Sequence, residues 1–295
     1  MSCVVSISPS SACVRDYISL MKPRLMSLAV FTAFVGMYLA PGHMHPILQF
    51  ISILSIACGA GAAGALNMWY EHDIDALMPR TKNRPIPAGR IHPDDALAFG
   101  VVNAFGSVLV LSFSATYLAG ILLAFTIAFY VFVYTMWLKR KTSQNIIIGG
   151  ACGAFPPLIG WASVSGTLSV EPLLLFLLIF VWQAPHFWAL SLFQKEGYAQ
   201  ANIPMLPVVE GIKETKKQIL LYTFFLNMSV FLPLSIGMFS YLYGAVALVL
   251  TVYFNACTWD VWKSEDVRQA KRLFWFSILY LFLLFSTMLI DHALR

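Results

Sequence analysis

The chain has 295 residues, of which 59% are hydrophobic and only 11% are charged. Ordinary soluble domains contain roughly 45–50% apolar and about 25% charged residues. With 14 Asp and Glu and 19 Lys and Arg, the sequence has too few charges to cover the surface of a soluble globule of this size. The composition therefore excludes a water-soluble fold and predicts that much of the surface faces lipid.

The N-terminus and the cysteines give no sign of export or cross-linking. No basic leader precedes the first short apolar stretch, which argues against a cleaved signal peptide. The cysteines occur without the paired spacing of a disulfide framework or a zinc site, at Cys3, Cys13, Cys58, Cys152 and Cys257. We expect them to act as small hydrophobic residues. We expect no nucleic-acid partner for a chain of this composition.

Membrane spans are predicted where long stretches contain no Asp, Glu, Lys or Arg, because a membrane helix needs about 20 largely apolar residues. Stretches of twice that length are expected to hold two helices, broken near residues 112–116 and 237–244. The predicted spans are 25–41, 47–68, two within 96–138, 145–164, 172–192, two within 218–259, and 273–290. The sequence thus predicts an all-α, polytopic membrane protein with nine transmembrane helices.

Basic residues test this count independently, because cytoplasmic loops carry an excess of Lys and Arg. With nine alternating spans, 18 of the 19 Lys and Arg fall in loops on one side, and only Arg295 falls on the other. The pattern predicts a cytoplasmic tail at 1–24, a single membrane domain at 25–290, and an external C-terminus at 291–295. It favours the cytoplasmic membrane as the location, with catalytic cytoplasmic loops at 70–95 and 193–217.

Polar residues recur at four-residue steps directly after the second predicted span. Asn67, Glu71 and Asp75 line one face if the helix continues, because four residues make about one turn. Carboxylates gathered at a membrane edge are costly unless a cation lies among them. Mg²⁺ takes one or two carboxylates and completes its shell with water and phosphate oxygens. We call these three residues the ladder and predict that they bind magnesium.

Basic residues follow the ladder within a few positions. Arg80, Lys82 and Arg84 can donate hydrogen bonds to phosphate oxygens, so the whole stretch indicates a magnesium diphosphate site. The alternative is that these charges mark a solvated cytoplasmic loop and only fix the topology. Asp73 and His72 lie off the ladder face, and we expect both to be solvated.

Longer motifs accompany the ladder through most of the chain. They are NxWxExxxD at 67–75, RTKNRP at 80–85, MKPR at 21–24, YTMWLKRKTSQNIIIGGACGAFPPLIGW at 134–161, WQAPHFWAL at 182–190 and ANIPMLPVV at 201–209. In content and order they resemble the UbiA-type intramembrane prenyltransferase superfamily. The ladder motif and RTKNRP are similar to its protohaem IX farnesyltransferase (haem O synthase) branch.

The resemblance implies a helical bundle with a lateral opening to lipid and a polar pocket under cytoplasmic loops. It implies transfer of farnesyl from farnesyl diphosphate to a vinyl group of haem b, with addition of water, giving haem O and diphosphate. Haem b is then a substrate and Mg²⁺ the cofactor. The product would pass to a downstream haem-modifying enzyme or a terminal oxidase assembly. The implied diphosphate contacts are Arg80, Lys82, Arg84, Lys139 and Arg140.

The second half of the chain departs from the family pattern. Many relatives have an Asp just before the Tyr in the loop after span six, and here Gly197 precedes Tyr198. Glu196 is one residue away and is a candidate substitute, so we treat Glu196 and Tyr198 as a possible second motif and leave Gly197 out.

His186 is the only histidine within a predicted span. As a catalytic candidate it would contact haem iron, orient a propionate or relay a proton. The alternative is a hydrogen-bonded helix kink, because Pro185 frees a carbonyl one turn earlier.

Span five contains a cluster of small and helix-breaking residues. Gly149, Gly150 and Gly153, with Pro156 and Pro157, are expected to break this span. The small residues either permit close helix packing or leave space for an isoprenoid tail.

Two other functions remain open from the sequence. A related prenyltransferase acting on an aromatic quinone precursor would share the diphosphate half of the site. An ion-coupled transporter would need ionisable groups near mid-membrane and access from both faces. The segments WQAPHFW and LKRKTSQNIIIGG favour haem, and acids gathered at one edge argue against transport.

Overall fold

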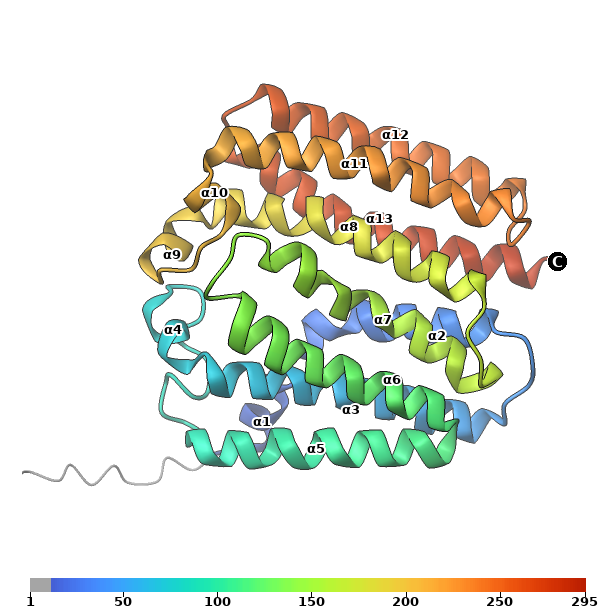
Figure 1. The fold of residues 1–295 in the computed structure, drawn as a ribbon, viewed down its shortest axis with the longest axis horizontal. Coiled ribbons are helices and arrows are strands. Elements are labelled where there is room, and N and C mark those ends of the chain that lie inside the picture. Colours follow the sequence, from blue (N-terminus) through green and yellow to red (C-terminus); the bar gives the residue numbers. More distant parts are fainter. Residues whose placement is uncertain (1–11) are drawn as a thin grey trace, which may run out of the picture.

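The structure is a computed structural model that describes residues 12–295. Cys3 and the first part of the expected tail lie outside the described residues. The described part of the chain is helical and contains no strand (Figure 1), which confirms the all-α fold class.

The helical elements of the described residues follow one another with short connections. They are α1 (Val14–Leu20), α2 (Pro23–Leu39), α3 (Pro46–Tyr70), α4 (His72–Leu77), α5 (Pro93–Ser114), α6 (Tyr117–Ala128), the π-helix η1 (Phe129–Leu138), α7 (Asn145–Ser165), α8 (Val170–Phe193), α9 (Lys195–Gln200), α10 (Leu206–Val209), α11 (Gly211–Ser235), α12 (Tyr241–Lys263) and α13 (Val267–Ala293).

Eight helical segments of the described chain are long and apolar enough to cross a membrane. The bent pair α1 and α2, which meet at 56°, brings the total to nine if the pair forms one span. The two double-length stretches divide as predicted, between α5 and α6 and between α11 and α12. The sequence did not predict α1, which occupies part of the stretch expected to be a tail.

Proline and capping histidines set where several spans begin. Pro23, Pro46 and Pro93 lie at the starts of α2, α3 and α5, where a missing N–H breaks no helical hydrogen bond. The imidazoles of His45 and His92 accept hydrogen bonds from the first turns of α3 and α5. These prolines and histidines set the first residues of α2, α3 and α5.

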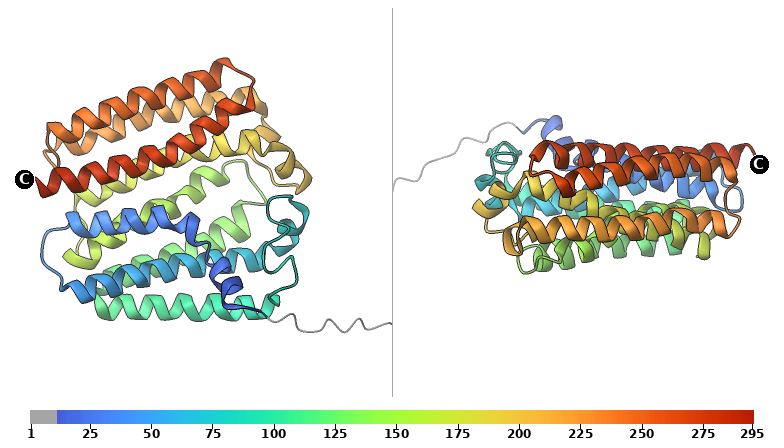
Figure 2. Two further views of the ribbon diagram at one scale, coloured as in Figure 1. Left: turned by 180° about the vertical axis from the view of Figure 1, so that it is seen from behind. Right: turned by 90° about the horizontal axis from the view of Figure 1, so that it is seen from above.

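The long helices lie side by side in an elongated bundle (Figures 1 and 2). The short helices α4, α9 and α10 gather at one end, and the C-terminus lies at the other. We call the first the basic end, because the connections, short helices and helix ends there carry every Lys and Arg of the described chain except Arg295. At the opposite end, Arg295 donates to the carbonyl oxygen of Met238 at 2.8 Å.

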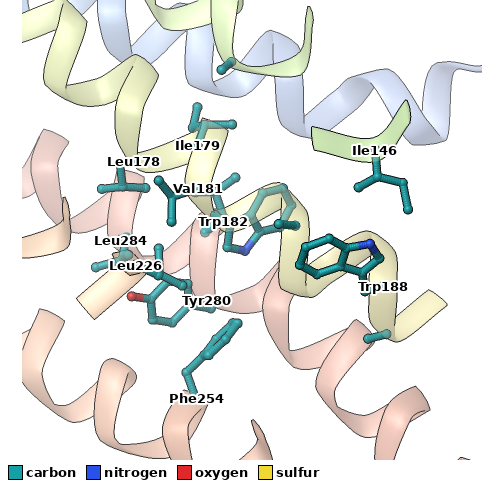
Figure 3. Close-up of a cluster of buried hydrophobic side chains, with 14 of the residues drawn as sticks. Ile146, Leu178, Ile179, Val181, Trp182, Trp188, Leu226, Phe254, Tyr280 and Leu284 are labelled. Carbon is teal, nitrogen blue, oxygen red and sulfur yellow. The ribbon is translucent and has the colours of Figure 1, made fainter. Parts of the chain in front are cut away.

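The largest apolar core includes residues of α8, α12 and α13. Trp182 and Trp188 of α8, Phe254 of α12 and Tyr280 of α13 are all buried there (Figure 3). Trp182 Nε1 also donates to the carbonyl oxygen of Ser277 at 2.9 Å, which ties α8 to α13. This packing holds the helix that carries the WQAPHFWAL segment.

Helix α7 packs against α2 with their backbones in close approach. Pro156 and Pro157 lie inside α7, which continues past both of them, so the expected break in span five is wrong. A Cβ on Gly160 of α7 would overlap the carbonyl oxygen of Ala33 on α2, and one on Gly36 of α2 would overlap that of Pro157. The small residues of this pair therefore permit close packing, as one of the two expectations held.

Replacing Gly160 with alanine should test this close contact. We expect Gly160→Ala to lower the free energy of unfolding by ~1–3 kcal/mol. The new methyl would meet the backbone carbonyl of Ala33, which cannot rotate away as a side chain could. Gly106→Ala in α5 is the matched control, since nothing lies within 4 Å of its new methyl. Thermal unfolding in lipid nanodiscs compares the two, and equal melting temperatures would contradict the close packing.

Candidate active site

The ladder lies at the basic end, where α3 passes into α4. The predicted continuous helix is wrong in detail, because α3 ends before Glu71 and α4 begins after it. The four-residue spacing nevertheless survives. Glu71 N donates to Asn67 O at 3.0 Å, and Asp75 N donates to Glu71 O at 2.8 Å. All three side chains are buried, with Glu71 only 1% exposed.

Each ladder side chain has one basic partner, and the partners come from three separate segments of the chain. The pairs are Lys22 Nζ to Asn67 Oδ1 at 2.6 Å, Lys139 Nζ to Glu71 Oε2 at 2.5 Å, and Arg84 Nη1 to Asp75 Oδ2 at 2.6 Å. Buried carboxylates are tolerable only when they are paired in this way. Of these partners, Arg84 and Lys139 were expected at the site and Lys22 was not.

One fully buried oxygen of the ladder has no hydrogen-bond partner among the described residues. Glu71 Oε1 is buried and accepts no hydrogen bond from any described residue, whereas Asn67 also donates to Thr135 Oγ1 at 3.2 Å. The ladder offers only oxygen atoms, from two carboxylates and one amide, which suits a hard cation such as Mg²⁺. Within residues 12–295, no group of three or more His, Cys, Asp and Glu is arranged to hold a metal. Magnesium fits this set with phosphate and water as the remaining ligands.

Lys22 is the functional candidate that the sequence reasoning missed. It lies between α1 and α2 in the left-handed backbone region, with φ of 51°. Burial, together with the positive charges of Arg84 and Lys139, lowers the pKa of Lys22 to about 7. Its only signal in the sequence is its place in the MKPR motif at 21–24.

The π-helix η1 brings a second group of side chains to the ladder. Lys139 N donates to Tyr134 O at 2.9 Å, the five-residue step of a π-helix, and such stretches are frequent at functional sites. Burial alone would lower the pKa of Lys139, but the carboxylate of Glu71 raises that pKa above its ordinary value. The rings of Tyr130 and Tyr134 lie 5.3 Å apart. A Cβ on Gly149 of α7 would overlap the Tyr134 ring, so glycine is needed there.

The loop after α4 folds back to bring Arg84 to the ladder. Thr81 Oγ1 donates to the carbonyl oxygen of Asp75 at 2.9 Å and turns the chain. Farther along the loop, Arg90 Nε donates to Asp16 Oδ1 at 2.7 Å, which ties the loop to α1. The unexpected helix α1 therefore supports the site from the N-terminal side.

The remaining basic candidates lie outside the ladder. Arg80 and Lys82 are exposed and have no acidic partner among the described residues. Arg140 donates to both carboxylate oxygens of Asp73, at 2.9 and 3.1 Å. Asp73 is 54% exposed, in keeping with the expectation that it is solvated, although it is also ion-paired. A cleft of about 230 Å³ opens beside this ion pair, toward residues 201–203.

The possible second motif lies on α9 at the same end of the bundle. Tyr198 is buried, whereas Glu196 is exposed and makes no hydrogen bond or ion pair with a described residue. The position that faces α4 is Gly197, whose Cβ would lie 3.4 Å from Met78 Cε. An acid at position 197 would thus approach Met78, which directly follows α4. Glu196, one residue earlier, is exposed.

His186 lies deeper in the bundle, away from the ladder residues. Its Nδ1 is 2.6 Å from Ser277 Oγ, and its ring stacks on Trp182 and Phe274 with centroids 4.6 Å away in each case. The imidazole is therefore held by α8 and α13, and it makes no contact with the ladder. The partner is thus a hydroxyl of another helix and not the carbonyl that Pro185 frees on α8, and the catalytic role of His186 stays a prediction.

The chain is similar to known proteins along most of its length. Residues 29–285 match the UbiA prenyltransferase family. The protoheme IX farnesyltransferase of Rhodopseudomonas palustris (strain HaA2) is 55% identical over 286 residues, which cover 96% of this chain and 91% of that protein.

Two solved structures share the fold at low sequence identity. A digeranylgeranylglyceryl phosphate synthase aligns with a TM-score of 0.79 at 15% identity, covering 96% of this chain and 99% of its own. A UbiA homolog from Archaeoglobus fulgidus, bound to DMAPP and Mg²⁺, aligns with a TM-score of 0.66 at 15% identity, covering 92% and 99%. Since the family match spans most of the residues and the Rhodopseudomonas relative matches almost end to end, this chain belongs to the UbiA prenyltransferase family.

Proposed function

We propose that this protein transfers the farnesyl group of farnesyl diphosphate to a vinyl group of haem b, with addition of water, to give haem O and diphosphate. The observation that carries the diphosphate half is the buried ladder, which has three basic partners and one Glu71 oxygen that accepts no hydrogen bond from a described residue. The 55% identical protoheme IX farnesyltransferase supports haem as the acceptor over an aromatic quinone precursor.

The ladder is the proposed magnesium site. Asn67, Glu71 and Asp75 would hold Mg²⁺, and the Archaeoglobus homolog bound to DMAPP and Mg²⁺ supports this assignment. When bound, the cation neutralises charge on the diphosphate as it leaves.

The chain's own basic residues would stabilise the same leaving group. The ladder accepts hydrogen bonds from Lys22, Arg84 and Lys139 in this structure. Each of these side chains can also donate hydrogen bonds to phosphate oxygens. Arg80 and Lys82 are exposed with no acidic partner among the described residues, so they are available to phosphate without breaking an ion pair. Donors aimed at developing negative charge lower the barrier to breaking the allylic carbon–oxygen bond.

The allylic cation that remains needs shelter from solvent. The rings of Tyr130 and Tyr134 lie 5.3 Å apart in a tilted arrangement, and Tyr134 accepts a backbone hydrogen bond from Lys139, the partner of Glu71. Aromatic faces attract cations without offering a strong nucleophile. These two rings are the proposed wall of the farnesyl site next to C1.

The proposal includes the orientation and location of the protein. The basic end would face the cytoplasm, with the N-terminus cytoplasmic and the C-terminus external, in the cytoplasmic membrane. The loops 70–95 and 193–217 would be the catalytic ones, with Tyr198 of α9 near the diphosphate. The product would pass to a downstream haem-modifying enzyme or a terminal oxidase assembly.

Product analysis tests the function directly. Purified protein in lipid nanodiscs is incubated with haem b, farnesyl diphosphate and Mg²⁺, and the extracted haems are identified by mass spectrometry. We expect haem O. Unmodified haem b would refute the proposal, and prenylation of 4-hydroxybenzoate in a parallel incubation would favour the quinone alternative.

Removing one ladder charge should abolish turnover without unfolding the protein. We expect Asp75→Asn to lower kcat by at least about a hundredfold, because the amide keeps the shape of Asp75 but removes one of the two negative charges that hold Mg²⁺. Glu265→Gln, at an exposed position between α12 and α13 and outside both proposed catalytic loops, is the control and should keep wild-type activity. Full activity in a well-folded Asp75→Asn protein would remove the ladder's proposed role.

The depressed pKa of Lys22 predicts pH-dependent binding of the diphosphate. As pH rises through about 7, the unliganded protein loses the Lys22 proton. Because the anion favours protonated Lys22, affinity should fall by up to about tenfold per pH unit above that point. Lys22→Arg should lack this fall, because arginine stays charged.

The measurement is the Kd of a non-hydrolysable farnesyl thiodiphosphate, with Mg²⁺, across this pH range. Comparing wild type with Lys22→Arg cancels the titration of the ligand itself. Parallel pH profiles for the two proteins would show that Lys22 does not contact the diphosphate.

A further inference from the structure

Gln183 is a buried polar residue that the proposed diphosphate site does not use. It lies on α8, is 5% exposed, and its Nε2 donates to no described residue. Two glycines of α7 face its amide group. A Cβ on Gly153 would lie 2.8 Å from Nε2, and one on Gly150 would lie 3.2 Å from Oε1. A methyl group at either position would therefore press on this amide.

This amide lies close to the ladder but deeper in the bundle. Gly149, which precedes the glycines facing Gln183, contacts the ring of Tyr134. Tyr134 in turn accepts a backbone hydrogen bond from Lys139, whose side chain pairs with Glu71. Gly153 comes eight residues after Asn145, where α7 begins, which is about 12 Å along the helix axis from the basic end. Gln183 is therefore positioned beyond the diphosphate, toward the membrane interior.

An unpaired buried N–H requires an acceptor oxygen from a ligand or a water molecule. The charged oxygens of diphosphate and of haem propionates are better matched by the cations of the basic end. The proposed reaction needs one more oxygen, that of the water which is added. A neutral amide can hold this water beside a carbocation without burying a charge.

We infer that Gln183 positions the water molecule that becomes the hydroxyl group of haem O, which rests on the proposed function. The vinyl π electrons form a bond from the terminal vinyl carbon to farnesyl C1 as the C1–O bond breaks and its electron pair leaves with diphosphate. The cation is then on the carbon attached to the pyrrole ring. The water held by Gln183 donates a lone pair to that carbon, and its proton passes to the released diphosphate.

Without a positioned water, the same cation has a second outcome. It loses a proton from the adjacent carbon, which becomes part of an alkene, and the proton again passes to diphosphate. The alkene product is lighter than haem O by one water molecule. The ratio of the two products therefore reports on water positioning, whereas a purely structural defect would slow both channels together.

The test measures this ratio by mass spectrometry in nanodiscs supplied with haem b, farnesyl diphosphate and Mg²⁺. Gln183→Met keeps the length of the side chain and removes its donor. We expect the ratio of alkene to haem O to rise at least about tenfold, which corresponds to ~1.4 kcal/mol between the two channels. Gln218→Met is the matched control, because Gln218 donates to Glu214 on α11 at 2.8 Å. Its ratio should equal that of wild type.

Gly153→Ala provides a second approach to the same amide. Its methyl would press on Nε2 without changing Gln183 itself, and we expect the same shift in product ratio. If Gln183→Met does not fold, the product ratio of Gly153→Ala tests the inference in its place.

If both variants make haem O without the alkene, whatever their turnover rate, the inference is overturned. Loss of all prenylated haem in folded variants would overturn it too, because water addition follows carbon–carbon bond formation. No prenylated haem from the wild-type protein would instead contradict the proposed function.

Discussion

Two carboxylates and an amide are buried at one end of an apolar bundle, and the rest of the site depends on how their charge is balanced. An isolated carboxylate in a medium of low dielectric constant is unstable by several kcal/mol, so each needs a partner that is itself held in position. Arg84 and Lys139 pair with the two carboxylates and Lys22 donates to the amide, and these three residues come from connections that are distant in sequence. The ladder therefore brings the start of α2, the loop after α4 and the end of η1 together.

Close helix packing provides the rigid support for that convergence. Tyr134 can lie beside the ladder because Gly149 on α7 leaves room for its ring, and α7 is itself held against α2 by the contact between Gly160 and Ala33. In a membrane, such packing replaces the hydrophobic driving force that holds soluble cores together. Small residues in span five thus permit close packing, and the space that they were also expected to leave for an isoprenoid tail stays a prediction. Some permit contact between helices, and others make room for polar or aromatic groups near the site.

The sequence predicted what depends on local pattern and missed what depends on distant pairing. Composition and charge placement were enough for the helical class and for breaks such as that between α5 and α6, because each is set within a few residues. The four-residue spacing likewise predicted that Asn67, Glu71 and Asp75 share a face. The role of Lys22 was hidden, since it lies 45 residues from Asn67 and any basic residue there satisfies the topology rule. The π-helix was also hidden, because its residues are as apolar as those of an ordinary span.

We propose that Arg84 and Lys139 neutralise the ladder carboxylates until substrate binds. Mg²⁺ then becomes the partner of the carboxylates, and diphosphate becomes the partner of the basic side chains. Mg²⁺ and diphosphate should then bind cooperatively, because either one alone leaves a buried charge without its partner. Calorimetric titration of Mg²⁺ into nanodisc-embedded protein, with and without farnesyl thiodiphosphate, measures this coupling. Mg²⁺ affinity at least about tenfold higher in the presence of the diphosphate, after correction for binding to the free ligand, is the predicted result. Equal Mg²⁺ affinity in both titrations would contradict the account.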